Sequence, residues 1–380
     1  MHIARVMDQA SMADVIGDND LLHEILLRLG LPAVLVRAAL VSKRWRGLAA
    51  DPRFLRRFRH RHPPSLLGFY VHDDRYRRQQ FVPVVSEAPE LHFAVSDPSA
   101  GVPVDCRNGR LLLKVGEFTT AQYLVRRPLC PTQGVIPILP PPPQLPVDWV
   151  PMPSRLCSKS ACLLSRDSSD NIVFVYLLLG GSRKLSVQVY VLQSGGVWGE
   201  VIVAQGELHA LSRDVWVEMV AHGKLYMASD NGCIHGLDFA APRPQFFTIK
   251  LPNEVGDNNY ELSSGDDGGF FLIHGERFQL SVWHHETDGK GWVLVDRFCV
   301  RVARDRWEKI LVLRAGDNAE YVLLGLRTSS VNIICVDLRS RKETVYEVRL
   351  SLPLYINVFP FMAVWPPVFP VLNDEDDQGK

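Results

Sequence analysis

The sequence predicts an α+β chain in two parts: a small N-terminal module of three helices, then a large all-β domain built as a β-propeller of about six blades. Helical apolar spacing ends near Pro63-Pro64. Beyond that point, short apolar runs alternate with Gly, Asp and Pro, without a helical period between them. A weak internal repeat also runs through this second part. The length of 380 residues fits one small module beside one large domain.

The first helix is predicted from capping residues and from apolar residues at helical spacing. Asp18 or Asn19 can cap its start, Gly30 suits its C-terminal cap, and Pro32 suits the first turn of the next helix. The apolar residues of this first helix form a broad face. They are Leu21, Leu22, Ile25, Leu26 and Leu29.

Two further helices complete the predicted module. One covers about residues 33–40 and is apolar nearly all round, and another begins after Ser42 and carries Trp45. Asp51-Pro52 then gives a second cap signal before a segment with aromatic residues on one side. Three short helices cannot bury this much apolar surface among themselves. The surplus either packs on the β-domain or contacts a partner, and the pattern alone leaves both open.

The β-domain is predicted from short runs rich in Val, Ile, Leu, Tyr and Trp, separated by turn residues. Many such strands without helices indicate a sandwich, a barrel or a propeller. The predicted strands are 66–71, 111–115, 123–127, 172–179, 185–192, 224–228, 270–273, 280–283, 292–295, 321–324, 331–336 and 344–350.

An internal repeat favours the propeller. Residues 108–114 resemble residues 222–228, with residues 274–283 as a looser relative. Residues 233–251 parallel residues 333–350, because each is an apolar strand that ends in Asp, followed by a polar turn and a returning strand. The two aspartates are 99 residues apart, about two units of the ~40–50 residues of a four-stranded blade. An irregular pair of β-sandwiches remains the alternative.

The predicted boundaries follow these composition changes. Residues 1–13 are expected to be disordered, 14–62 form the helical module, 63–372 the β-domain and 373–380 an acidic disordered tail. Within the β-domain, the proline-rich residues 138–153 are expected to form an extended surface loop. A ligand for a WW- or SH3-type module is the alternative for this segment.

Overall composition excludes several classes of protein. Lys and Arg number 42, as do Asp and Glu, so the net charge gives no argument for a nucleic-acid or membrane partner. We find no apolar run long enough to span a bilayer and no secretory signal at the N-terminus. The seven scattered cysteines suit reduced thiols, so we expect the protein in the cytoplasm, the nucleus or both.

Motifs for catalysis, cofactors or metals are weak. The chain lacks a phosphate-cradling Gly-rich motif and a nucleophile elbow. His284-His285 would point to opposite faces of a strand, Cys157 and Cys162 lack a second ligand pair, and residues 264–269 suit a turn between strands. We therefore predict a non-catalytic protein with no catalytic residues, no cofactor and no metal site.

Basic residues gather at the end of the helical module. Such a run could contact phosphates, but interleaved aromatic residues suit packing, so a solvated helical face is preferred over nucleic-acid binding. The eight basic residues are Lys43, Arg44, Arg46, Arg53, Arg56, Arg57, Arg59 and Arg61, with Asp51 as the single acidic residue in the run.

The helical module resembles an F-box, the module that binds the Skp adaptor in SCF-type cullin–RING ubiquitin ligases. Gly17-Asp18 stands where the family often has Leu-Pro. The family's first-helix pattern is met by Leu21, Leu22, Glu24, Ile25, Leu26 and Leu29. Its later pattern is met by Leu35, Arg37, Val41, Ser42, Lys43 and Trp45.

The rest of the chain is similar to the F-box-associated, kelch-like β-propeller domain of large plant F-box families, especially those of grasses. The resemblance implies a receptor that binds the adaptor, and through it a cullin and a RING subunit, while its propeller recruits a target protein. A scaffold without a ubiquitin-ligase role is the alternative. No target-binding residue is predicted. The predicted adaptor-binding residues are Leu21, Leu22, Ile25, Leu26, Leu29, Leu35, Val41 and Trp45.

Overall fold

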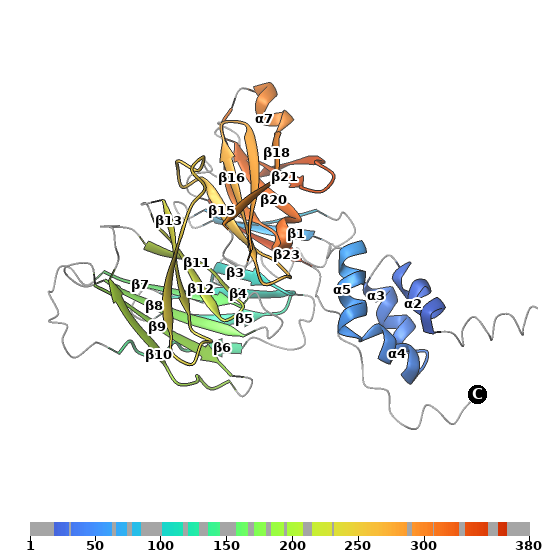
Figure 1. The fold of residues 1–380 in the computed structure, drawn as a ribbon, viewed down its shortest axis with the longest axis horizontal. Coiled ribbons are helices and arrows are strands. Elements are labelled where there is room, and N and C mark those ends of the chain that lie inside the picture. The colour runs from blue at the N-terminus through green and yellow to red at the C-terminus, as the bar shows by residue number, and fades with distance from the viewer. Residues whose placement is uncertain are drawn as a thin grey trace, which may run out of the picture. The chain divides into compact units, whose positions relative to one another are not determined.

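The structure is a computed structural model of the chain (Figure 1). The chain divides into two compact units between residues 65 and 66, and the second unit spans Leu66–Phe361. The residues described are 19–29, 32–62, 66–73, 78–84, 101–116, 121–128, 136–144, 157–165, 171–179, 184–193, 196–207, 215–229, 232–286, 291–306, 308–326, 331–348 and 356–362. The predicted disordered N-terminus and acidic tail lie outside them.

The first unit consists of helices. Ser42 caps one of them, since its Oγ accepts a hydrogen bond from the Trp45 N–H at 3.2 Å. The Asp51 carboxylate caps the next helix and accepts from two backbone N–H groups. Both predicted caps are confirmed, but the described residues hold four helices instead of the three expected, because the segment after Asp51-Pro52 is itself a helix. The helices are α2 (Asn19–Leu27), α3 (Pro32–Ala39), α4 (Lys43–Ala49) and α5 (Pro52–Arg61).

One apolar core joins these four helices. Phe54 and Phe58 of α5 are buried in it, with ring centroids 5.9 Å apart. A ring nitrogen of His62 lies 2.8 Å from the Leu27 carbonyl oxygen and connects the end of α5 to α2. The buried core residues are Leu22, Leu26, Leu27, Leu35, Ala39, Ala49, Phe54 and Phe58.

The second unit is a six-bladed β-propeller. Each blade is a separate antiparallel sheet, and five of the six contain four strands among the described residues. The strands are β1 (Leu66–Asp73), β2 (Arg78–Pro83) and β23 (Ile356–Met362) in blade 1; β3 (Val102–Arg107), β4 (Arg110–Val115), β5 (Gln122–Arg126) and β6 (Ile136–Ile138) in blade 2; β7 (Cys157–Leu164), β8 (Ile172–Leu179), β9 (Lys184–Leu192) and β10 (Ile202–Glu207) in blade 3; β11 (Val215–Ala221), β12 (Lys224–Ser229), β13 (Cys233–Asp238) and β14 (Gln245–Lys250) in blade 4; β15 (Tyr260–Ser264), β16 (Phe270–Glu276), β17 (Gln279–His285) and β18 (Trp292–Cys299) in blade 5; and β19 (Ile310–Ala315), β20 (Tyr321–Leu326), β21 (Val331–Asp337) and β22 (Glu343–Val348) in blade 6.

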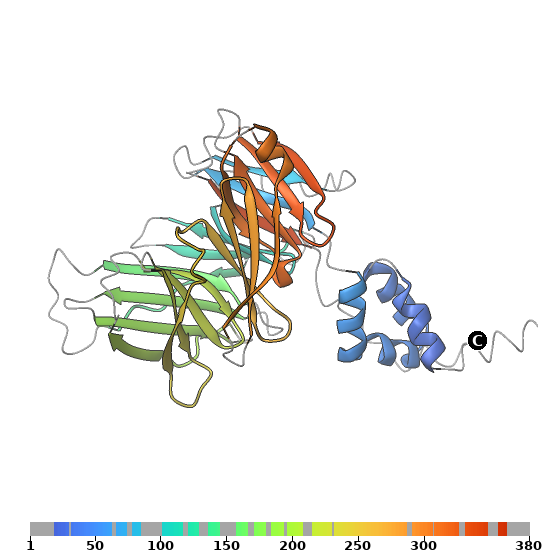
Figure 2. The ribbon, with the colours of Figure 1, turned by 45° about the horizontal axis from the view of Figure 1, so that its top comes forward.

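The strands follow the chain in order within blades 2 to 6, as expected for hairpin-linked meanders (Figure 2). Blade 1 differs, because β23 from the end of the unit pairs beside β1 from its beginning. This pairing connects the two ends of the strand unit within one sheet. The first strands of blades 2 to 6 contact one another from blade to blade, so they form the inner layer. Short helices α7 (Arg301–Arg306) and η4 (Asp317–Ala319) lie in connections.

Apolar cores fill the spaces between neighbouring blades. Leu225 and Met227 of blade 4 share a core with Val187 and Val189 of blade 3. A comparable core joins blades 5 and 6. A single sheet has two faces to cover, and here each face is covered by the next blade, as the propeller prediction requires.

All twelve predicted strands are present, and the predicted blade number is confirmed. The repeat also has a structural basis. Asn108-Gly109 and His222-Gly223 form equivalent two-residue turns between the first and second strands of blades 2 and 4, with positive φ at all four residues. Asp238 and Asp337 both end the third strand of a blade.

Residues 138–144 are the described part of the proline-rich segment: Ile138 ends strand β6, and residues 139–144 have no helix or strand. The rest of that segment, from residue 145, lies outside the described residues. Among the residues that are described, no helix is both long and apolar enough to cross a bilayer.

Candidate partner-binding surfaces

Helix α2 presents two apolar faces with different exposure. Leu22 and Leu26 are fully buried in the module's core, whereas Leu21 and Ile25 are 44% and 40% exposed. Each pair is spaced by four residues and therefore lies on one side of the helix. The sequence pattern had placed all four residues in the adaptor-binding set, and the structure separates them into a core pair and a surface pair.

The other predicted adaptor-binding residues divide in the same way. Leu35 is fully buried, and Leu29 and Trp45 are half-buried against the same core. Val41 is 64% exposed, in the turn between α3 and α4. Adaptor contact by all of these residues stays a prediction, but the buried ones cannot reach a partner unless the module opens.

Among the described residues of the module, five large apolar side chains are exposed to solvent. A concentration of exposed apolar side chains on so small a unit indicates an interaction surface. The sequence analysis missed Val34 and Leu40, which lie in α3 and directly after it. We refer to the five as the exposed apolar set: Leu21, Ile25, Val34, Leu40 and Val41.

Two residues of the basic run connect helices within the module. The Arg44 guanidinium donates two hydrogen bonds to Asn19 Oδ1, at 3.0 and 2.7 Å, and so connects α4 to α2. Arg57 of α5 forms an ion pair with Glu24 of α2 at 3.1 Å. Exposed pairs of this kind stabilise a fold by less than about 1 kcal/mol. They hold α2 at a fixed orientation, with Leu21 and Ile25 facing outward.

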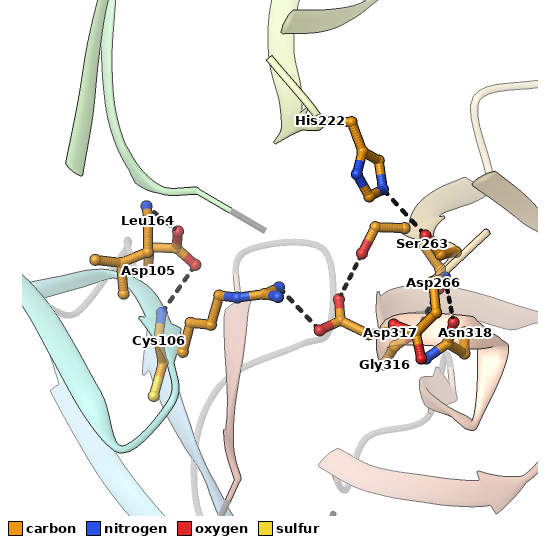
Figure 3. Close-up of polar contacts among 12 residues, drawn as sticks. Asp105, Cys106, Leu164, His222, Ser263, Asp266, Gly316, Asp317 and Asn318 are labelled. Atoms are coloured by element: carbon orange, nitrogen blue, oxygen red, sulfur yellow. Dashed lines mark hydrogen bonds and ion pairs between the residues drawn. The ribbon is translucent and has the colours of Figure 1, made fainter. Parts of the chain in front are cut away.

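In the propeller, polar contacts join the inner ends of blades 2, 5 and 6 (Figure 3). Arg107 of β3 forms an ion pair with Asp317 at 2.8 Å, and the Ser264 hydroxyl donates to the same carboxylate at 3.0 Å. Ser263 is fully buried, and its Oγ donates to the Gly316 carbonyl and accepts from the Ala319 N–H. Both bonds hold the η4 turn against blade 5.

A second polar group of the inner layer centres on Arg314 of β19. Its guanidinium lies 3.5 Å from the Glu261 carboxylate of β15. Burial lowers the pKa of Arg314, but the carboxylates of Glu261, Asp105 and Glu218 more than offset this, so its pKa lies above the ordinary value. Asp105 also accepts hydrogen bonds from the backbone of Cys106 and Leu164, which joins blades 2 and 3 (Figure 3). These contacts connect the blades to one another.

The residues considered for metal binding have other contacts. A ring nitrogen of His284 lies 3.2 Å from the Asp267 carboxylate, while His285 stacks on Phe270, with ring centroids 5.1 Å apart. Residues 264–269 join β15 to β16, as predicted for a turn. Within the described ranges, no group of three His, Cys, Asp or Glu side chains is close enough to hold a metal ion.

An open pocket of about 320 Å³ lies beside β14 and the β15–β16 turn. Its lining includes aromatic residues from two blades, among them Phe247 of blade 4 and Phe270 of blade 5. Burial lowers the pKa of His285 at its edge, and the neighbouring His284 lowers it further. From the sequence, His285 and residues 264–269 were considered only for metal binding, and no pocket was predicted, because these side chains come together only when the blades stack.

Comparison with protein families assigns both units. Residues 19–61 match the F-box-like family, and residues 103–369 match the family described as F-box protein AT5G49610-like, beta-propeller. The fold and these matches define a plant F-box protein with a C-terminal propeller. Because the second match covers more than half of the chain, the protein belongs to the AT5G49610-like F-box β-propeller family.

A curated relative agrees with this assignment. The chain is 26% identical to the F-box protein At5g03970 of Arabidopsis thaliana over 305 residues, which cover 73% of this chain and 68% of that protein. Among solved structures, the periplasmic gluconolactonase PpgL of Pseudomonas aeruginosa is similar with a TM-score of 0.40 and 14% identity, covering 76% of this chain and 85% of that one. A chain of a nidogen/laminin complex is similar with a TM-score of 0.40 and 10% identity, covering 77% of this chain and 97% of that one. These TM-scores are too low to bear on function.

Proposed function

We propose that this protein is a substrate-receptor subunit of an SCF-type cullin–RING ubiquitin ligase, acting in the cytoplasm, the nucleus or both. In this proposal the F-box binds the Skp adaptor and the propeller recruits a target protein. The receptor performs no chemistry itself, and it accelerates ubiquitin transfer by raising the local concentration of target lysines. The observation that carries the proposal is an F-box whose exposed apolar set remains outside its own core.

The exposed pair on α2 supplies the sharpest test. Leu21 and Ile25 lie about 100° round the helix from Leu22 and Leu26 and are partly exposed, so changing them leaves Leu22 and Leu26 in the core. An aspartate at an apolar interface would place an unpaired charge where water is excluded. Changing Leu22 or Leu26 instead would unfold the module, and lost binding would then have two explanations.

The experiment is co-purification of the full chain with a Skp adaptor and a cullin. The unmodified chain is expected to retain both, and Leu21→Asp/Ile25→Asp to bind the adaptor at least about 100-fold more weakly, since interface anchors cost 2 kcal/mol or more each. The matched control is Val293→Asp/Val295→Asp, at exposed apolar positions of β18 in the propeller.

The control variant is expected to bind the adaptor as the unmodified chain does. If the unmodified chain retains neither adaptor nor cullin, the receptor proposal is wrong. Retention of both without any ubiquitylated client, measured by proteomics under proteasome inhibition, would favour a scaffold instead.

A further inference from the structure

A segment with four consecutive prolines, residues 139–144, lies against the aromatic side of blade 3. Three side chains of that blade donate hydrogen bonds to its backbone carbonyls. The Trp198 indole N–H donates to Leu139 at 2.7 Å, the Tyr176 hydroxyl to Pro141 at 2.8 Å and the Tyr190 hydroxyl to Pro142 at 3.2 Å. All three hydrogen bonds are accepted by backbone carbonyl oxygens, so none involves a side chain of residues 139–144.

Gln188 supplies the fourth side chain of this group. It is fully buried on β9, its Oε1 accepts from the Gln144 N–H at 2.9 Å, and its Nε2 donates to the Gln144 carbonyl. Both polar ends of a buried amide are therefore used on the backbone of one residue. A buried amide left without such partners would cost about 1–3 kcal/mol, so the two bonds to the Gln144 backbone offset the cost of burying Gln188.

The aromatic rings form a continuous row beneath the segment. Phe174 contacts Tyr176 and Trp198 edge-on, with ring centroids 4.9 and 6.3 Å apart, and Tyr176 contacts Tyr190 at 6.3 Å. Phe174 and Tyr176 alternate along β8, so both rings project from one face of the sheet. Aromatic rows that carry hydroxyl and indole donors are how protein modules recognise polyproline II peptides.

The chemistry of proline explains why this segment suits the hydrogen-bond donors of blade 3. A proline has a carbonyl but no N–H, and its φ is fixed near −65°, which favours the polyproline II conformation. Residues 140–143 therefore offer only acceptors, and the side chains of blade 3 offer donors to them. A segment of ordinary residues would bring four further N–H groups that need acceptors, whereas Gln188 Oε1 already accepts from the Gln144 N–H.

We propose that Tyr176, Gln188, Tyr190 and Trp198 form a receptor site for proline-rich segments of target proteins, and that residues 139–144 occupy it in the free protein. Pro142, Pro143 and Gln144 are exposed on their outer side, so another peptide can reach the segment from solvent, and its exchange uncovers Gln188 and Tyr190 until the new peptide covers them. The role of this site in choosing targets rests on the proposed receptor function, but the site itself can be tested alone.

The first experiment uses the full chain and weakens the binding of residues 139–144 to the site. Residues Pro140, Pro141, Pro142 and Pro143 are all changed to Gly, which removes the preference for polyproline II. A fluorescent, end-capped peptide with the sequence LPPPPQ is then titrated. The changed chain is expected to bind it at least about tenfold more tightly than the unmodified chain, because the glycine segment, although still tethered, loses more conformational entropy when it adopts the polyproline II conformation and so competes more weakly. The peptide LAAAAQ is expected not to bind either chain.

Variants of the donors identify the site. Adding Tyr176→Phe and Tyr190→Phe to the glycine variant is expected to weaken peptide binding about tenfold, since two hydrogen bonds are lost. Tyr226→Phe in β12 of blade 4 makes the same chemical change outside the site and is expected to leave binding unchanged. If the glycine variant folds and does not bind LPPPPQ, the proposal is wrong.

If the glycine variant does not fold, a measurement on the unmodified chain tests the proposed peptide site. Hydrogen exchange of the Gln144 amide is followed while LPPPPQ is added. Displacement of the segment breaks the bond from this amide to Gln188, so exchange is expected to accelerate with peptide concentration. Unchanged exchange up to millimolar peptide would contradict the proposal. Neither experiment involves the adaptor, so a negative result would contradict the proposed peptide site without contradicting the receptor proposal.

Discussion

The F-box and the propeller differ in where they leave apolar side chains exposed. In the F-box, the exposed apolar set occupies α2, α3 and the turn after α3. In the much larger propeller, the exposed apolar side chains among the described residues lie mainly on the fourth strands, at the outer edges of the blades. They are Ile136, Val203, Val293, Leu294, Val295 and Val345, with Leu139 and Val197 in connections.

This difference follows from size and from repetition. Each propeller blade buries its faces against the next blade, so the described exposed apolar residues lie mainly at outer edges and in connections. Four short helices enclose one small core and cannot enclose more, so apolar side chains beyond its capacity remain on the surface. The F-box therefore uses apolar residues in two ways, for its own core and for a surface, and neighbouring positions of α2 differ in which role they have.

The largest expected effect is the difference in stability between alanine substitutions at two neighbouring leucines of α2. Leu22→Ala removes a fully buried side chain from the core shared by α2 to α5 and is expected to lower the free energy of unfolding of the F-box by about 2–5 kcal/mol. Leu21→Ala is expected to change it by less than about 0.5 kcal/mol, as for other surface positions. Hydrogen exchange of the α2 to α5 amides in the full chain measures both.

Propeller amides serve as the internal reference, since neither change touches that unit's strands. Equal effects of Leu21→Ala and Leu22→Ala on the F-box would show that α2 has no distinct core face, and the comparison between core and surface leucines would then fail.

A smaller effect is expected at the inner end of blade 5. Ser263→Ala removes the hydroxyl that bonds both Gly316 and Ala319, and it leaves the buried Ala319 N–H without this partner. We expect the propeller to lose about 1–3 kcal/mol of stability, measured by urea unfolding. Ser340→Ala is the matched control, because its hydroxyl also makes two local hydrogen bonds but is exposed to water. That change is expected to have almost no effect.

Local signals made much of the fold predictable. Ser42 and Asp51-Pro52 mark helix starts through contacts within three residues, so sequence spacing alone locates them. The second and third strands of the blades are rich in apolar residues, and most of them were predicted. The first strands, β3, β7, β11, β15 and β19, were all missed. In three of them a charged inner-layer residue, Asp105, Glu218 or Glu261, interrupts the apolar pattern.

The candidate sites were less predictable, because they depend on contacts distant in the sequence. Leu21 and Leu22 have the same side chain and adjacent positions, and only the placement of α4 and α5 decides which one is buried. Likewise, Arg107 meets Asp317 only once the blades close into a ring. The proline-rich run was recognisable by composition, but its partners Tyr176, Gln188 and Tyr190 come from strands of another blade.

The smallest effect concerns the Asp51 cap of α5 and acid. Hydrogen bonds from the backbone N–H groups of Phe54 and Arg53 lower the pKa of this carboxyl below 3.8 in the folded state. The unfolded chain then binds more protons, so the cap's contribution is complete above about pH 5 and is lost as pH falls through the folded pKa. Protection factors of α5 amides are expected to fall in this range, and less so in Asp51→Asn, which keeps a cap without a titrating group. An equal fall in both proteins would assign the acid sensitivity of the F-box to another carboxyl.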